Sequence, residues 1–352
     1  MMKIRTVYIE KSIKNKSLLN IICSKLSKVK KVFINNPKDV GSNKSVSPFL
    51  IKDSLILAEQ KGPFILRCPC SPNQIPCGYW IIDWGMGCPY KCSYCYLNYY
   101  QNCRGILVYV NINRCFVELE EFLSKQKQIV RIGTGEFIDS LALEGVVPVA
   151  KRFVEYFAKK DNAVLELKTK STCIEHLLKL KHKKRTVISW SVNTKHVAKI
   201  EEIGAPSVVA RINAAKKAQS AGYPIGFHFD PICYYQGWEN DYKDLVDQIF
   251  KKITPESVEW ISLGTLRFNP ALKNILRDHY PNQRLLLGEL IVGQDGKMRY
   301  VRPLRVKIYN TVADYLLKYI PRSKLYLCME SPEIWQDWGQ TSTIDNRYFI
   351  TD

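Results

Sequence analysis

From about residue 79 onward, short runs of apolar and β-branched residues alternate with longer stretches in which apolar residues recur at helical spacing. This alternation is typical of strand–helix units that build a parallel sheet. The expected strands are six runs, at 79–83, 129–134, 164–168, 186–191, 225–229 and 258–263. Because parallel strands joined by right-handed crossovers close into a barrel or an open partial barrel, we predict an α/β fold of that kind. Active residues of such a fold collect at the carboxyl ends of its strands.

The helical patterns and the flanking segments divide the chain into three expected parts. Residues 1–78 are expected to form an N-terminal α/β segment, residues 79–285 the partial barrel, and residues 286–352 a short C-terminal extension. Within the extension we expect a hairpin around Asp295-Gly296, a helix near 309–319 and a strand at 324–329. The helices expected between the barrel strands are 116–126, 147–159, 174–180, 205–221 and 242–253.

Composition favours a folded protein over a disordered one. Among the 352 residues, 46% are hydrophobic and 11% are aromatic, which is enough to bury a sizeable core. No stretch reaches roughly 18 consecutive apolar residues, so the sequence predicts no membrane span. The start, Met1-Met2-Lys3-Ile4-Arg5, leads into a charged segment and not into the apolar region of a signal peptide. We therefore expect a cytoplasmic protein.

The chain is strongly basic, with 52 Lys and Arg against 33 Asp and Glu and a net charge of +19. Such an excess favours a polyanionic partner, because each neutralised phosphate releases condensed counterions. A solvated, lysine-rich surface is the alternative explanation, since charge alone does not identify a partner. Basic residues concentrate in two places, at 25–31 and at 179–185. Nucleic acid is the expected partner.

Twelve cysteines in a chain without a secretory signal argue against a disulfide framework. In a reducing compartment, clustered cysteines are more often metal ligands, whereas scattered ones are small core residues. Eight of the twelve fall between Cys68 and Cys115, so the first half of the chain is where a metal site is expected.

The cysteines with the clearest spacing are Cys88, Cys92 and Cys95, in the pattern Cys-x3-Cys-x2-Cys just after the first expected strand. Three thiolates at this spacing can wrap one face of a 4Fe–4S cluster, one on each of three irons. The fourth iron then has no protein ligand and is open to chemistry, as in catalytic metal sites. A zinc site with Cys103 or a histidine as fourth ligand is the alternative, but zinc sites usually pair two Cys-x2-Cys knuckles and the sequence has no second one.

The cysteine motif resembles that of the radical S-adenosylmethionine (SAM) superfamily, and three further elements fit. Gly133-Thr134-Gly135-Glu136 looks like the Gly-Gly-Glu element that binds the methionine amino group. Ser191 and Asn193 would contact the ribose hydroxyls and the methionine carboxylate, and Tyr94 stands at the aromatic position beside adenine. The resemblance implies a partial (β/α)6 barrel with S-adenosyl-L-methionine and a 4Fe–4S cluster as cofactors. It also implies a reduced flavodoxin or ferredoxin type electron donor and a 5′-deoxyadenosyl radical.

Over most of the chain, from about Thr6 to Trp335, the sequence is similar to the spore photoproduct lyase family of DNA-repair enzymes. The resemblance implies cleavage of the methylene-bridged thymine dimer of ultraviolet-damaged DNA, with Tyr96 in the radical relay and Lys170 at the cofactor carboxylate. The residues that carry it are 87–97, 108–111, Thr169-Lys170, Ser191-Val192-Asn193, Ala221-Gly222-Tyr223, Pro231-Ile232, Gly237-Trp238-Glu239, Arg267-Phe268 and Tyr280-Pro281.

The sequence departs from that family at the thiol that quenches the substrate radical. In the best-known members this thiol lies at the end of the second strand, where the present chain reads Ile132-Gly133-Thr134-Gly135 and has no cysteine. Cys233, after the fifth expected strand, and Cys328 are the expected substitutes. For each, a buried core cysteine is the alternative reading.

A second departure is the group Cys68-x-Cys70-x6-Cys77 just before the first expected strand. It could bind zinc or an auxiliary cluster, with Cys103 or Cys115 as fourth ligand.

Three other residues are candidates for the substrate side of the site. His228 and Asp230 end the fifth expected strand with side chains on one face, where they could touch substrate or act as an acid–base pair. A hydrogen-bonded structural pair would explain them equally well. Arg267 could hold a phosphate with two hydrogen bonds, or form an ion pair at the end of the barrel.

Three functions remain open from the sequence. The first is a SAM-dependent DNA-repair lyase of the spore photoproduct lyase type. The second is another radical SAM enzyme that modifies nucleic acid, such as RNA, which the missing thiol and the possible extra metal site would favour. The third is a zinc-stabilised nucleic-acid-binding protein without enzymatic activity.

Overall fold

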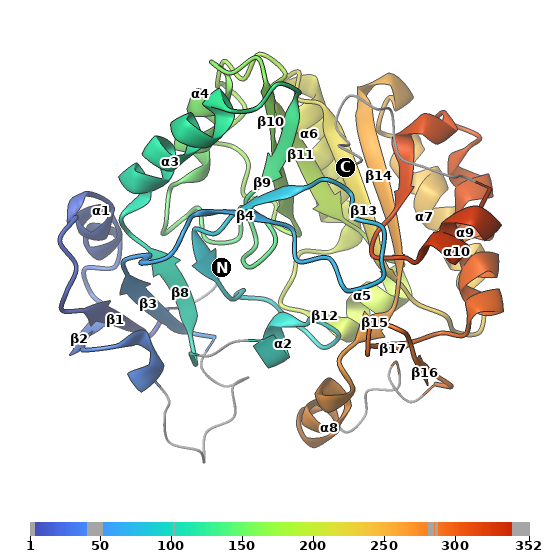
Figure 1. The fold of residues 1–352 in the computed structure, drawn as a ribbon, viewed down its shortest axis with the longest axis horizontal. Coiled ribbons are helices and arrows are strands. Elements are labelled where there is room, and N and C mark those ends of the chain that lie inside the picture. Colours follow the sequence, from blue (N-terminus) through green and yellow to red (C-terminus); the bar gives the residue numbers. More distant parts are fainter. Residues whose placement is uncertain (1–3, 41–51, 101–102, 281–284, 286–287, 340–352) are drawn as a thin grey trace.

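The computed structural model describes residues 4–40, 52–100, 103–280, 285 and 288–339 (Figure 1). Its main sheet has eight strands in the order β18-β14-β13-β11-β10-β9-β5-β4. Neighbouring strands are parallel except for β4, which pairs antiparallel with β5 at the sheet edge. The bounds of the eight are β4 Ile65–Arg67, β5 Trp80–Ile82, β9 Val130–Gly133, β10 Ala163–Thr169, β11 Thr186–Ser191, β13 Ile225–Ile232, β14 Val258–Thr265 and β18 Leu325–Leu327. This curled sheet confirms the predicted α/β partial barrel.

The six expected barrel strands are confirmed as β5, β9, β10, β11, β13 and β14. Strands β10 and β14 are buried along almost their whole length, because helices pack on one side and side chains fill the other. The helices that cover or flank this sheet are α3 Ile112–Ser124, α4 Ala150–Phe157, α6 Val208–Ser220, α7 Trp238–Phe250, α9 Arg302–Leu316 and α10 Pro332–Asp337.

One helix prediction is wrong. Residues 174–180 form successive turns and no helix. Their backbone hydrogen bonds run from Leu177 to Ile174 and from Leu180 to Leu177, three residues back, and the buried Ile174 and Leu177 hold the segment against the core. The apolar residues whose spacing predicted a helix therefore include Ile174 and Leu177, which are buried against the core from a non-helical segment.

A second sheet holds the N-terminal part of the chain, in the order β2-β1-β3-β8-β6. Figure 1 shows it on the left, beside helix α1 and apart from the barrel strands. Its elements are β1 Thr6–Glu10, α1 Ser17–Lys25, β2 Lys30–Ile34, β3 Ser54–Ala58, β6 Gly85–Met86 and β8 Ile106–Tyr109. The pairing of β3 with β8 and of β4 with β5 crosses the predicted boundary at residue 78, and the pairing of β14 with β18 crosses the boundary at 285. The division into three parts stays a prediction.

Short elements surround the carboxyl ends of the barrel strands: β7 Lys91–Cys92, α2 Leu97–Tyr100, α5 Lys195–Glu201, β12 Glu202–Ile203, β15 Arg267–Phe268, α8 Pro270–His279, β16 Ile291–Val292 and β17 Met298–Arg299. The expected hairpin around Asp295-Gly296 is formed by β16 and β17. Pro281, which belongs to the family resemblance, lies outside the described residues, as do residues 286 and 287 at the predicted boundary.

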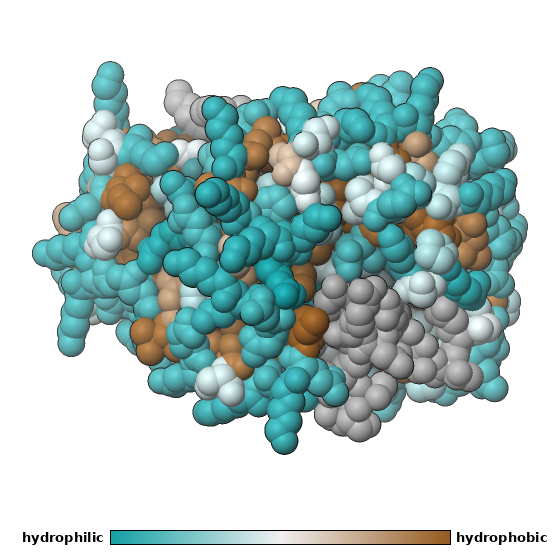
Figure 2. Space-filling view, turned by 90° about the horizontal axis from the view of Figure 1, so that it is seen from above, coloured by the Kyte–Doolittle hydropathy of each residue, from teal (hydrophilic) through white to brown (hydrophobic). Residues whose placement is uncertain are grey.

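The face seen in Figure 2 is mostly hydrophilic, with scattered apolar patches. Within the described ranges, no helix has the length and apolar character needed to cross a membrane.

Candidate active site

A cavity of about 490 Å³ lies at the carboxyl ends of strands β9, β10, β11 and β13. The expected site residues that line it are Cys88, Cys92, Cys95, Tyr94, Tyr96, Gly135, Glu136, Lys170, Ser191, His228, Asp230, Arg267 and Cys328. Gly133, Thr134, Asn193 and Cys233 are not among its lining residues. Strands of a parallel sheet end at one edge, so residues far apart in the sequence meet there.

The cysteine loop presents Cys88, Cys92 and Cys95 to this cavity, and none of them forms a disulfide. Asn98 holds the loop, because its side-chain amide donates to the carbonyl of Cys92 at 2.8 Å. Burial raises the pKa of the Cys92 thiol to about 12, while the nearby Lys170 opposes that rise. Because iron binds thiolates, a cation beside the loop favours cluster binding. Three free thiols at cluster spacing on one cavity wall fit a 4Fe–4S cluster.

Two adjacent glutamates brace this loop. Glu202, in β12, pairs across the antiparallel ribbon with Cys92 in β7. The hydroxyl of Tyr94 donates to the Glu202 carboxylate, and the hydroxyl of Ser93 donates to the carboxylate of Glu201. The backbone N–H of Ser93 also donates to the Glu201 carbonyl at 2.9 Å. The loop between the second and third cluster cysteines is therefore tied to the end of helix α5.

Glu202 is the centre of a buried charge cluster. Arg211 Nη2 lies 2.5 Å from one carboxylate oxygen and Lys170 Nζ lies 3.9 Å from the other. Burial by itself would raise the pKa of Glu202, but Lys170 and Arg211 together hold that pKa below its ordinary value. Lys170, expected at the cofactor carboxylate, also lies over the ring of Tyr94 at 5.7 Å. Sequence reasoning missed both residues, because Glu202 reaches the cysteine loop only through the ribbon β7–β12 and Arg211 meets Glu202 from helix α6.

Glu136 also has protein partners already. Its carboxylate lies 2.8 Å from Lys168 Nζ, and the Tyr96 hydroxyl donates to its backbone carbonyl at 2.6 Å. Lys168, in strand β10, was not predicted as a site residue, although it lies two residues before Lys170 and both line the cavity. A methionine amino group at Glu136 would share this carboxylate with Lys168.

Two expected cofactor contacts are occupied within the fold. Asn193 is fully buried, donates to the carbonyl of Pro231 at 2.8 Å and accepts from the hydroxyl of Tyr242 at 2.7 Å. Thr134 donates to Ser140 at 2.8 Å. Ser191, in contrast, lines the cavity.

A Cβ atom would collide with neighbouring atoms at Gly133, the last residue of strand β9, and at Gly135, two residues beyond it. A Cβ atom at Gly133 would lie 1.7 Å from the hydroxyl oxygen of Tyr79, and one at Gly135 would lie 2.6 Å from the carbonyl of Lys168. The ring of Tyr79 and the backbone of β10 therefore occupy the space that a cysteine at the end of this strand would need.

A buried polar network forms the floor of the cavity. Arg131 pairs with Glu166 at 2.8 Å, and His228 Nε2 lies 2.9 Å from the other oxygen of Glu166, to which Trp260 Nε1 also donates. The second ring nitrogen of His228 bonds the Ser262 hydroxyl at 2.6 Å. Burial lowers the pKa of His228, although Glu166 opposes that shift. His228 thus lines the cavity as a side chain with both ring nitrogens hydrogen-bonded.

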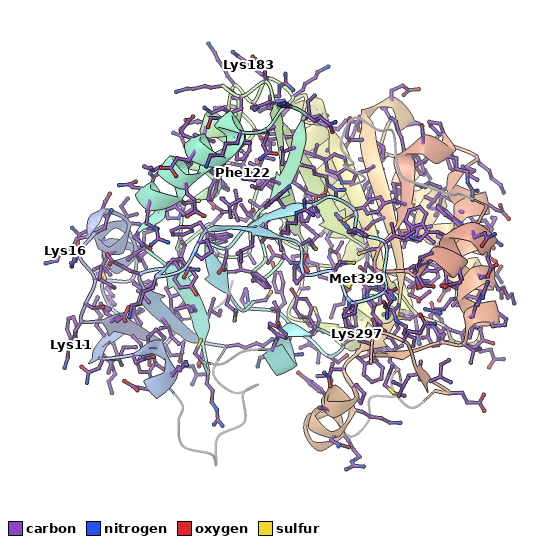
Figure 3. All side chains as sticks on the ribbon, in the orientation of Figure 1. Lys11, Lys16, Phe122, Lys183, Lys297 and Met329 are labelled. Atoms are coloured by element: carbon purple, nitrogen blue, oxygen red, sulfur yellow. The ribbon has the colours of Figure 1, made fainter. Side chains whose placement is uncertain are left out.

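Asp230 pairs with Arg267 and not with His228. Arg267 donates through both terminal nitrogens, at 2.9 and 3.0 Å, to the two Asp230 oxygens. The guanidinium also donates to the sulfur of Cys328 at 3.6 Å and to that of Met329 at 3.4 Å. Lys297 reaches Met329 from the β16–β17 hairpin, and Figure 3 shows these two side chains next to each other. Of the two readings of Arg267, the ion pair is the one formed.

Seven of the nine remaining cysteines separate into two groups, to which the partly exposed Cys23 and the exposed Cys173 do not belong. Cys103 packs in a small core with Val40 and Ile56, and Cys115 is buried on α3. Cys233 has no exposed surface and its thiol points to the carbonyl of Pro231. The thiols outside the cluster motif that line the cavity are Cys68, Cys70, Cys77 and Cys328.

These four cavity thiols come from two segments, and the N–H of Ile75 in the first donates to the carbonyl of Glu330 in the second at 3.0 Å. The sequence paired Cys68, Cys70 and Cys77 with Cys103 or Cys115, whereas the fold brings Cys328 to them. No group of three His, Cys, Asp or Glu side chains in the described part of the chain, the cluster loop included, already stands in metal-ligand positions.

In comparison with known proteins, residues 72–328 match a family model described as spore photoproduct lyase. The spore photoproduct lyase of Bacillus subtilis (strain 168) is 30% identical over 224 residues, which span 61% of this chain and 64% of the relative. That of Geobacillus sp. (strain Y412MC61) is 27% identical over 260 residues, 71% of this chain and 76% of the relative. The Bacillus match therefore covers less than two thirds of that relative's length.

Two solved structures have the same fold. A spore photoproduct lyase complexed with dinucleoside spore photoproduct aligns with a TM-score of 0.82 at 22% identity, covering 93% of this chain and 98% of that one. A mutant lyase with bound AdoMet and dinucleoside spore photoproduct aligns with a TM-score of 0.78 at 22% identity, covering 92% and 97%. The likeness extends over nearly the whole chain and establishes its fold, the partial barrel included.

Proposed function

The chain belongs to the spore photoproduct lyase family, and from this premise we propose that it is a radical SAM lyase of DNA repair. Its substrate would be the methylene-bridged thymine dimer. One observation carries the proposal: Cys88, Cys92 and Cys95 open into the same cavity as Tyr96 and Glu136, at the carboxyl ends of the barrel strands.

The cavity wall offers a group for each part of the implied cofactors. Cys88, Cys92 and Cys95 would hold the 4Fe–4S cluster, and Tyr94 would lie beside the adenine of S-adenosyl-L-methionine. When bound, these cofactors supply a 5′-deoxyadenosyl radical. Lys170, from the end of β10, would meet the cofactor carboxylate, and Ser191 a ribose hydroxyl. The brace of Glu201 and Glu202 keeps the loop that carries Tyr94 in one position.

After the bridge between the bases breaks, the remaining thymine radical needs one hydrogen atom. Of the two substitute donors expected from the sequence, Cys328 lines the cavity, whereas Cys233 is enclosed in the core. We assign the donor role to Cys328. Arg267 donates to its sulfur and is itself held by Asp230, so the thiol is kept at the cavity wall. Tyr96, hydrogen-bonded to Glu136, would complete the relay.

The net charge of +19 supports DNA as the macromolecular partner, since phosphate neutralisation dominates nucleic-acid affinity. Extrusion of the lesion from the duplex costs less at a damaged, badly stacked site. A reduced flavodoxin or ferredoxin type protein would deliver the electron. Gly133 and Gly135, which leave no room for the usual thiol, favour one second candidate function, a radical SAM enzyme that modifies RNA.

The test is anaerobic reconstitution of the full chain with iron and sulfide, then reduction in the presence of SAM and dinucleoside spore photoproduct. We expect release of the repaired thymine dinucleoside, with SAM consumed far more slowly than product forms. A variant with Cys88, Cys92 and Cys95 replaced by Ala serves as the inactive control. Formation of 5′-deoxyadenosine without repaired product would refute the substrate and turn attention to RNA.

A further inference from the structure

We propose that Tyr79 and Arg131 form a hydrogen-bond-donor subsite on the floor of the cavity, which receives a carbonyl oxygen of the substrate pyrimidine. This inference rests on the proposed function, because it names a determinant of base recognition within the same cavity. Both side chains line the cavity, and their exposed fractions are only 6% and 2%.

The first observation is a set of unpaired donors. Among the described residues, the hydroxyl of Tyr79 has no hydrogen-bond partner, and neither do Nε and Nη1 of Arg131. The third guanidinium nitrogen, Nη2, is the one that pairs with Glu166 at 2.8 Å and with the hydroxyl of Tyr326 at 2.7 Å. A buried polar group without a partner costs roughly 1–3 kcal/mol, so such groups in a cavity indicate a ligand that pairs with them.

The second observation is their common position. Arg131 and Gly133 lie two residues apart on strand β9 and so share one face of the sheet. The Tyr79 hydroxyl stands above Gly133, where a Cβ would lie 1.7 Å from it, and the Arg131 guanidinium carbon lies 4.9 Å from the centre of the Tyr79 ring. The glycine thus makes room for the phenol beside the guanidinium.

The chemistry of the donors selects the ligand. A guanidinium can only donate hydrogen bonds, so the group it meets must be an acceptor. The charge of Arg131 is already balanced by Glu166, and a neutral acceptor therefore fits better than a phosphate. Thymine presents carbonyl oxygens, whereas cytosine presents an amino donor at the position of the thymine O4. The subsite should therefore favour thymine over cytosine.

The experiment replaces Tyr79 by Phe, which removes the hydroxyl and keeps the ring beside Arg131. Because the hydroxyl has no partner, we expect the melting temperature of the metal-free protein to stay the same or to rise. Binding of dinucleoside spore photoproduct to the reconstituted protein should weaken roughly fivefold, the effect of one neutral hydrogen bond. The preference for the dinucleotide TpT over dCpC should fall by a similar factor.

Tyr223→Phe is the matched control, since the buried hydroxyl of Tyr223 donates to the carbonyl of Leu177 at 2.8 Å, away from the cavity. It should lower the melting temperature and leave binding unchanged. Equal binding by wild type and Tyr79→Phe, or a lower melting temperature of Tyr79→Phe, would overturn the subsite. A wild-type protein that neither binds nor cleaves the lesion would overturn the proposed function, and the TpT-to-dCpC ratio would then still decide the subsite.

Discussion

Glu202 lies opposite Cys92 in the antiparallel ribbon β7–β12, so the carboxylate that gathers Lys170 and Arg211 sits beside a cluster cysteine. The same carboxylate accepts the hydroxyl of Tyr94. One acidic residue, about a hundred positions away in sequence, thus holds the loop that would carry the 4Fe–4S cluster.

Glu202→Gln should lower the free energy of unfolding by roughly 3–5 kcal/mol, because it leaves Lys170 and Arg211 buried without a counter-charge. Denaturant unfolding of the metal-free protein measures the change. Glu175→Gln is the control: its ion pair with Lys217 is exposed and should contribute at most about 1 kcal/mol. Equal losses in the two variants would contradict the role of Glu202 as the centre of a buried cluster.

The Glu202 cluster, together with the separate network around Glu166, predicts a dependence of stability on pH. Burial alone would raise the folded-state pKa values of Glu202 and Glu166. Their basic neighbours outweigh burial and hold both pKa values below the ordinary value of 4.5. Their stabilising contribution is therefore complete above pH 4.5 and is lost as the pH falls through the folded-state values. The melting temperature should fall below pH 4.5 more steeply for wild type than for Glu202→Gln. If the melting temperatures of wild type and Glu202→Gln fell in parallel with pH, the pKa of Glu202 would not be lowered in the folded state.

The reconstituted wild-type chain should bind about four iron atoms, all lost when Cys88, Cys92 and Cys95 are replaced by Ala. Iron and zinc analysis with visible absorption measures both. The informative control replaces Cys68, Cys70 and Cys77, which line the same cavity, and should leave the metal content unchanged. A loss of metal in that variant would show that a second site exists there.

Gly133→Ala should destabilise the protein by roughly 1–3 kcal/mol, since its Cβ would collide with the Tyr79 hydroxyl. Gly145→Ala is the comparison, because nothing lies within 4 Å of a Cβ at that position. Thermal unfolding of both variants gives the difference. If Gly133→Ala were as stable as Gly145→Ala, the Tyr79 side chain would move aside easily. The Tyr79 hydroxyl would then not be fixed against Gly133.

Cys328→Ser should reduce repaired product relative to 5′-deoxyadenosine, because the product radical loses its hydrogen donor while radical formation continues. Cys233→Ser should leave this ratio alone and lower stability by about 1 kcal/mol, as expected for a fully buried cysteine. Product and 5′-deoxyadenosine are measured in the same reaction. An unchanged ratio in Cys328→Ser would move the donor role to another cavity thiol.

The sequence by itself determined the elements whose signal is local. Apolar runs along the sequence predicted the six strands β5, β9, β10, β11, β13 and β14, because each strand is buried along its own length whatever its neighbours are. The spacing of Cys88, Cys92 and Cys95 predicted a cluster loop for the same reason, since three thiols within eight residues reach one cluster without help from the rest of the chain.

Only the tertiary structure decided which side chains meet. The pairing of Asp230 with Arg267, of Glu136 with Lys168, and the position of Tyr79 above Gly133 depend on strand order and register. The short strand β18 brings Cys328 to the cavity only because it extends the sheet beside β14. No local pattern encodes these contacts, because their free energy depends on segments that the chain brings together only when the barrel forms.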